Sequence, residues 1–200
     1  MNILPGPRAF AAYVYQIRAY VYVIVALWAF SALIGATMAI AMPQESQQLV
    51  ETIGNQMKPL LSDSSFTLMI NIFLNNARAC LLEVGLGLGL GLLPLLIVFV
   101  NGLAMGLVIA ISMAKAGPLF MAAALLPHGI IEIPVVALSA AIGLRFGHCV
   151  LMAALRQAVD LKKELIEGVS VFIFWLIPLL FVAAFVESYV TVALLYFLMG

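Results

Sequence analysis

Five long apolar runs dominate this sequence and leave few ways for it to fold. Each run has about 20 or more residues, the length that a helix needs to cross roughly 30 Å of hydrocarbon. Hydrophobic residues make up 66% of the chain and charged residues only 9%, whereas soluble domains have roughly 25% charged residues. We therefore predict an all-α fold, a polytopic integral membrane helical bundle that forms one transmembrane domain over residues 1–200. The predicted spans are residues 19–42, 66–92, 94–114, 118–146 and 169–197.

Two polar stretches separate some of these runs. Residues 43–65 contain several charged and amide side chains, which predict an extracytoplasmic loop or a short surface helix that ends before Pro59. In residues 147–168, leucine and valine recur at helical spacing while charged residues fill the other faces. This pattern is typical of an amphipathic helix on the membrane surface. We also expect a tight turn near Leu92-Leu93-Pro94 and a kink at Pro178.

The basic residues predict how the bundle lies in the membrane. In a five-span chain, six of them fall on one side and two on the other, which places the N-terminus in the cytoplasm and the C-terminus outside. Nine basic and nine acidic residues cancel, so nucleic-acid binding has no electrostatic support. The cytoplasmic set is Arg8, Arg18, Arg145, Arg156, Lys162 and Lys163, and the opposite set is Lys58 and Lys115.

Several polar side chains lie inside the predicted spans, where they are costly to bury. His128 and Glu132 are four residues apart, so they share one face of a helix. Arg78 cannot lose its proton and must find a partner, for which Glu83 or Glu132 is the candidate. The amides of this set are Asn75, Asn76 and Asn101.

Three interpretations of this polar set stay open. It can be a satisfied polar core that fixes helix register, a proton or ion path, or a metal or hydrolytic site with His128 and Glu132 as two ligands. The sequence lacks the second histidine of a His-Glu-x-x-His motif, and no other histidine lies in a span. We therefore predict no catalytic residues, no resident metal and no cofactor.

Small residues four positions apart suggest close helix packing. Such spacings let helix backbones approach each other in lipid, either within one chain or across a homodimer. Gly129 would let a neighbouring backbone approach His128. Two cysteines, Cys80 and Cys149, are expected to be packed free thiols. The expected packing glycines are Gly85, Gly89, Gly102, Gly106, Gly129 and Gly143.

Four motifs together resemble the stage II sporulation protein M-like family of integral membrane proteins, over roughly residues 15–198. They are Phe73-Leu74-Asn75-Asn76, then Asn101-Gly102 with Gly106, then Leu126-Pro127-His128-Gly129-Ile130-Ile131-Glu132-Ile133-Pro134, and finally Gly143-Leu144-Arg145 with Gly147. The resemblance implies that Asn75, Asn76, Asn101, Gly102, His128, Gly129 and Glu132 are characteristic positions, without assigning them a chemistry.

The resemblance also implies a function. In spore-forming bacteria, the protein that names the family acts as a scaffold in a membrane complex that localises cell-wall hydrolases. We therefore expect a non-enzymatic protein of the cell membrane, surrounded by lipid bilayer, that forms a homodimer and assembles with other membrane or envelope proteins. The alternative is a small permease or proton-coupled transporter that uses the buried polar set.

Overall fold

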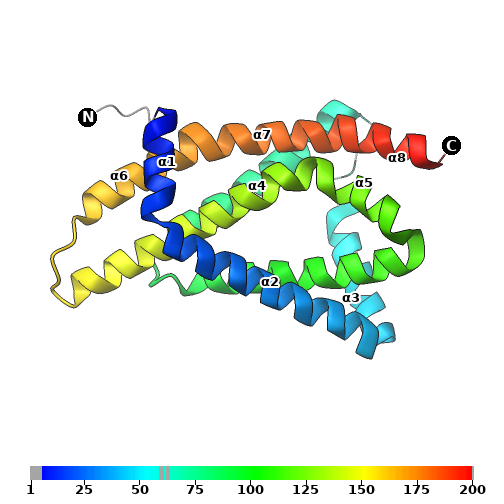
Figure 1. Ribbon diagram of the computed structural model, residues 1–200, viewed down its shortest axis with the longest axis horizontal. Coiled ribbons are helices and arrows are strands. Elements are labelled where there is room, and N and C mark those ends of the chain that lie inside the picture. The colour runs from blue at the N-terminus through cyan, green and yellow to red at the C-terminus, as the bar shows by residue number, and fades with distance from the viewer. Residues whose placement is uncertain (1–5, 59–60, 62–63, 200) are drawn as a thin grey trace.

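The computed structural model describes residues 6–58, 61 and 64–199, and every regular element in this part of the chain is helical (Figure 1). The fold is thus all-α, as the sequence predicts. The helices in chain order are α1 (Pro7–Gln16), α2 (Arg18–Ala41), α3 (Pro43–Met57), α4 (Ser65–Leu86), α5 (Leu92–Ala154), α6 (Leu161–Val171), the π-helix η2 (Phe172–Leu176), α7 (Ile177–Phe185), the π-helix η3 (Val186–Thr191) and α8 (Val192–Met199).

The long helices run side by side along the long axis of the molecule (Figure 1). Helices α1 and α6 lie at one end, and α3 and the C-terminal helix α8 lie at the other. Within the described residues, three helices are long and apolar enough to cross a membrane: Arg18–Ala41, Leu92–Ala154 and the continuous helix Leu161–Leu198. Helix α4 is more polar than these because it carries three asparagines, an arginine and a glutamate.

Helix α5 is two helices joined at a sharp bend. Gly117 has φ 84° and ψ 166°, a conformation that no helix contains and that favours glycine. Pro118 follows it at the start of the second leg, where a missing N–H does no harm. The two legs, residues 92–116 and 118–154, therefore run in opposite directions. Pro127 and Pro134 lie inside the second leg, and its backbone stays helical through both.

The turn between α4 and α5 falls earlier than the sequence analysis expects. It comprises residues 87–91 rather than Leu92-Leu93-Pro94, and Pro94 already lies inside α5. Leu90 and Gly91 both have positive φ values, 63° and 74°. Gly85, Gly87, Gly89 and Gly91, which the predicted span 66–92 places inside a helix, therefore lie at the end of α4 and in the turn after it, because glycine removes the steric penalty of left-handed backbone.

Residues 147–168 do not form the single amphipathic helix that the sequence analysis predicts. Helix α5 continues to Ala154, residues 155–160 form a connection, and α6 begins at Leu161. Arg156 interrupts the helical path with φ 58°. Asp160 then caps α6 by accepting a hydrogen bond of 3.0 Å from the backbone N–H of Lys163. The charged residues of this stretch thus lie in the connection and on α6, and not on the end of α5.

The last helix contains two π-helical segments. The first, η2, ends two residues before Pro178, so the irregularity expected near this proline takes the form of a widened turn. The second, η3, carries Glu187 and Thr191. In the polar stretch before α4, α3 forms the surface helix that the sequence allows, and residues 59–60 and 62–63 lie outside the described part.

The core forms where α5 meets its neighbours on both sides. Helix α2 packs along the first leg of α5, and α4 and the last helix pack against the second leg. The fully buried side chains include Ile24 of α2, Phe146 of α5 and Leu176 and Leu180 of the last helix. The second leg is therefore the central element, and its polar residues face other helices.

Candidate functional site

Three ionisable side chains converge between the second leg of α5 and the last helix. His128 and Glu132 lie one turn apart on α5, and Glu187 lies on η3. One nitrogen or oxygen atom from each of the three lies within 4.8 Å of the others. All three side chains are partly buried. We call His128, Glu132 and Glu187 the interior triad.

Neighbouring polar groups surround the interior triad. The hydroxyl of Thr191, one turn after Glu187, lies 3.5 Å from Nδ1 of His128. On α4, the amide of Asn76 lies beside the Glu132 carboxylate. Asn75 donates a hydrogen bond of 3.3 Å from its Nδ2 to Oδ1 of Asn76. The polar faces of α4 and the second leg of α5 therefore meet, and the last helix closes the group.

Glu83 occupies a different and fully enclosed position. Its side chain has no exposed surface, and neither carboxylate oxygen has a hydrogen-bond partner among the described residues. The hydroxyl of Ser139, across on α5, is also fully buried and lies beside the Cys80 thiol. Burying an unpaired polar or charged group costs stability. The interior of this bundle therefore holds a carboxyl group that contributes no visible bond to the fold.

Arg78 and Asn101 do not join the buried set. Both are exposed in the single chain, and no ion pair joins Arg78 to Glu83 or Glu132 in the described residues. The reason lies in helical geometry. Arg78 and Glu83 are five residues apart, which places them about 140° apart around α4 at 100° per residue. The predicted ion pair of Arg78 with a buried carboxylate is therefore absent from this structure.

Two predicted glycines pack α5 against α2. A Cβ atom on Gly102 would overlap the side chain of Ser31, and one on Gly106 would overlap the carbonyl of Ala32. Such contacts leave room only for hydrogen at these positions. The backbones of the two helices therefore approach closely, which is the main way that helices associate in lipid.

A second glycine contact joins α4 and the following turn to the second leg of α5. A Cβ on Gly143 would overlap the carbonyl of Glu83, and one on Gly87 would overlap the backbone of Gly143. Gly147 lies in the same way against the backbone of Gly91. The glycine stretch thus supplies its packing surface through Gly87 and Gly91.

The other predicted packing glycines have no such contact. Gly85 is exposed, with nothing within 4 Å of an added Cβ, and Gly89 would meet only a carbonyl of its own turn. Gly129 is buried, but an added Cβ would meet only the side chain of Ile133, at 3.6 Å. A neighbouring backbone therefore does not approach His128 through Gly129.

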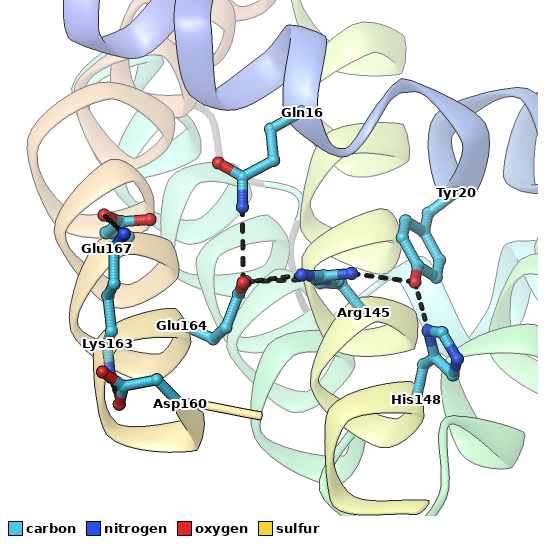
Figure 2. A network of polar contacts seen from close by, with 8 residues as sticks. All are labelled: Gln16, Tyr20, Arg145, His148, Asp160, Lys163, Glu164 and Glu167. Atoms are coloured by element: carbon cyan, nitrogen blue, oxygen red, sulfur yellow. Dashed lines mark hydrogen bonds and ion pairs between the residues drawn. The ribbon is translucent and has the colours of Figure 1, made fainter. Parts of the chain in front are cut away.

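The structure contains a second polar cluster that the sequence analysis missed, at the end of the molecule that carries α1 and α6 (Figure 2). Arg145 binds Glu164 in a two-pronged ion pair, with Nη2 to Oε1 at 2.6 Å and Nε to Oε2 at 3.1 Å. Nη1 of Arg145 donates to the Tyr20 hydroxyl at 3.1 Å, and that hydroxyl also bonds to Nδ1 of His148. Gln16 donates to Glu164 at 3.3 Å. We call these five residues the end network.

The end network fastens four helices to one another. Its members come from α1, α2, the end of α5 and α6. Nearby, the Tyr13 hydroxyl is buried without a hydrogen-bond partner in the described part of the chain. Burial, and secondarily the Glu164 carboxylate, raise the pKa of Tyr13. The sequence shows Arg145 and Glu164 only as charges near helix ends, so their pairing depends on the tertiary fold.

Glu187 is the member of the interior triad that the polar set predicted from the sequence does not include. Its position in the outer half of the last apolar run is equally consistent with a side chain that reaches the membrane interface. It lies 55 residues after Glu132 in the sequence, and no local spacing connects the two. The one available signal is its rarity, because an ionisable residue within an apolar span is by default a functional candidate.

The family model for stage II sporulation protein M matches residues 23–192, most of the chain. This chain belongs to the stage II sporulation protein M family. No curated protein and no solved structure matches it.

The matched region shows which features lie within the stage II sporulation protein M family domain. It begins inside α2 and ends one residue after Thr191. The whole interior triad, its neighbours on α4 and the packing glycines therefore lie within it. Of the end network, Gln16 and Tyr20 precede the match.

Proposed function

We propose that this member of the stage II sporulation protein M family is a non-enzymatic protein of the cell membrane that assembles as a homodimer and positions partner proteins. Family membership supports this role, as do three helices that are long and apolar enough to cross a bilayer. The observation that carries it is Arg78, which lies on an exposed, otherwise apolar face of α4.

Five crossings fit this proposal. Helix α4 and the two legs of α5 would each cross once, as would α2 and the last helix. The positive-inside rule then places α1 and α6 in the cytoplasm and α3 outside. A cysteine substituted for exposed Gln47 of α3 should react with an impermeant maleimide on intact cells, and one substituted for exposed Gln157 should not. The reverse pattern would contradict this orientation.

The exposed face of α4 has the composition of a contact surface. Its residues recur every three or four positions, so they form one continuous stripe. The stripe is apolar except for the arginine, and it includes Gly85, which offers space for a close approach. The exposed residues of this stripe are Leu74, Arg78, Leu81, Leu82, Gly85 and Leu86.

Arg78 makes this stripe unsuitable for lipid. At 1.5 Å per residue, it lies about 20 Å along α4 from Ser65 and about 12 Å from Leu86. An arginine within a span costs about 2.5–3.5 kcal/mol on insertion scales. Its Cβ leans toward the N-terminus of α4 and so away from the nearer end. A hydrogen-bond acceptor on a second copy or a partner would remove this cost.

Cysteine crosslinking in native membranes tests the proposal. Leu82→Cys should form a disulfide-linked dimer on mild oxidation, because Leu82 lies beside Gly85 on the stripe. Val25→Cys, which is also exposed but lies on α2, is the matched control and should stay monomeric. Arg78→Leu and Gly85→Leu should each abolish the Leu82 crosslink while the protein still folds. Equal crosslinking at both positions, or none at Leu82, would contradict an α4 interface.

The transporter alternative gains no support from the described residues. A groove of about 480 Å³ lies at the other end of the molecule from the predicted pathway, lined by apolar residues together with Tyr20 and His148. His128 does not line it. A proteoliposome assay separates the two functions, since loss of a proton flux in Glu132→Gln would indicate transport.

A further inference from the structure

The interior triad places two carboxylates and an imidazole close together with no balancing cationic side chain. Neither Glu132 nor Glu187 forms an ion pair with any lysine or arginine in the described part of the chain. The three groups come from two helices and are partly buried between them, where charge repulsion is screened less than in water. A cation held between the carboxylates would remove that repulsion.

We propose that His128, Glu132 and Glu187 bind a divalent transition-metal ion, of which Zn²⁺ and Mn²⁺ are the best candidates. One imidazole nitrogen with two carboxylate oxygens is a ligand set that suits these ions. Ca²⁺ prefers six to eight oxygens, which this site does not offer, and soft ions such as Cu⁺ prefer sulfur. Water would complete the coordination. The site is additional to the assembly role and does not depend on it.

The spacing of the three groups fits such an ion. Ligands that lie about 2.0–2.2 Å from one ion are separated from each other by roughly 3–4.4 Å. The potential ligand atoms here lie within 4.8 Å of one another. Closing the remaining distance requires small side-chain rotations on two helices that already pack together. The site is therefore largely formed in the folded chain.

The surrounding groups resemble an outer shell. Metal-bound histidines commonly have a hydrogen-bond partner on the second ring nitrogen, and metal-bound carboxylates are themselves hydrogen-bonded. The Thr191 hydroxyl lies 3.5 Å from Nδ1 of His128, and the Asn76 amide lies beside Glu132. These contacts orient two of the three ligands. The bound ion would then fasten the last helix to the second leg of α5.

Metal binding to the purified full chain tests the proposal. The protein, isolated through a tag without histidine and stripped with a chelator, is dialysed against Zn²⁺, Mn²⁺ or Co²⁺ in detergent. We expect about one ion per chain. Loss of an outer-shell group typically lowers affinity 10–100-fold, so Glu187→Gln and His128→Gln should each lower it more than about 100-fold. The metal affinity of Asn76→Leu should lie between that of these variants and that of the wild type.

Two matched variants make the test specific. Glu83→Gln changes the other buried carboxylate, and His148→Gln changes the other histidine of the chain; both should bind metal like the wild type. If either control loses binding as strongly as Glu187→Gln, or if the wild type binds none of the three ions at micromolar concentration, the proposal is wrong. If the triad variants fail to fold, X-ray absorption of the Co²⁺-loaded wild type decides. A Co²⁺ coordination shell of one imidazole nitrogen with oxygen ligands otherwise supports the site. Any other coordination shell overturns the proposal.

Discussion

The two polar clusters of this molecule both place ionisable side chains between helices, but only the end network pairs their charges. In the end network, Arg145 meets Glu164 with two hydrogen bonds, and Tyr20 and His148 extend the chain of bonds. Donors there match acceptors, and opposite charges meet. In the interior triad, two carboxylates lie beside a histidine without any ion pair among the described residues. Both clusters join the second leg of α5 to the last helix.

This difference separates a structural role from a functional one. A cluster whose charges and hydrogen bonds are matched can be explained by the fold that it stabilises. A cluster of like charges inside a membrane bundle weakens the fold unless something else binds to it. The end network therefore accounts for how α1, α2, α5 and α6 are held together, and the interior triad is where we place a ligand.

The largest expected effect comes from breaking the end network. Arg145→Met would leave the Glu164 carboxylate, whose side chain is only 12% exposed, without its main partner. Removing one member of a buried pair typically costs 3–5 kcal/mol, and partial exposure reduces this to about 2–3 kcal/mol. The free energy of unfolding in mixed detergent measures the loss. Arg156→Met, at an exposed arginine, is the control, and an equal loss in both would contradict the account.

A smaller effect should follow at the glycine contact that lies between the two clusters. Gly143→Ala forces a methyl group into the carbonyl of Glu83, and overpacking of this kind costs about 1–3 kcal/mol. Gly85→Ala is the matched substitution on the open side of α4, where nothing lies within 4 Å. It should be neutral or stabilise the helix by up to about 1 kcal/mol. Equal effects at the two positions would refute the close contact of α4 with α5.

The smallest expected effect is at Glu83, which tests whether a buried carboxyl without a partner contributes to stability. Methionine has a similar length and no need for hydrogen bonds. Because the Glu83 oxygens have no partners in the described residues, Glu83→Met should leave the free energy of unfolding unchanged or raise it by about 1 kcal/mol. A loss of 2 kcal/mol or more would show that Glu83 makes a contact that this structure does not contain, and the same unfolding assay measures it.

The sequence predicts the helical elements well because their signal is local. Apolar length alone locates α2 and the first leg of α5 within two residues. The second leg runs eight residues past its predicted end, and the last helix begins eight residues before its predicted start. The sequence also predicts that Gly102, Gly106 and Gly143 pack closely. The turn over residues 87–91 is harder to predict from the sequence, because alternating glycines fit a helix face as well as a turn. Only the positive φ values of Leu90 and Gly91 distinguish the two.

The clusters were predicted only in part because they depend on long-range contacts. His128 and Glu132 lie one turn apart, so their proximity follows from helix geometry. Their meeting with Glu187 depends on how the last helix packs and on the π-helical segment that carries it. Arg78 shows the converse error, because its charge suggested a buried partner while its position around α4 turns it outward.

A double-substitution cycle between Glu132 and Glu187 tests the central claim, that these carboxylates are neighbours inside the bundle and share a cation. Unfolding is measured for the wild type, Glu132→Gln, Glu187→Gln and the double variant, with chelator and with saturating Zn²⁺. In chelator, each single substitution should relieve repulsion and so raise the free energy of unfolding. The double variant should gain less than the sum of the two single gains, by at least about 0.5 kcal/mol. Zn²⁺ should stabilise the wild type alone. Effects that add within about 0.3 kcal/mol in both conditions, with no stabilisation by Zn²⁺, would contradict the account.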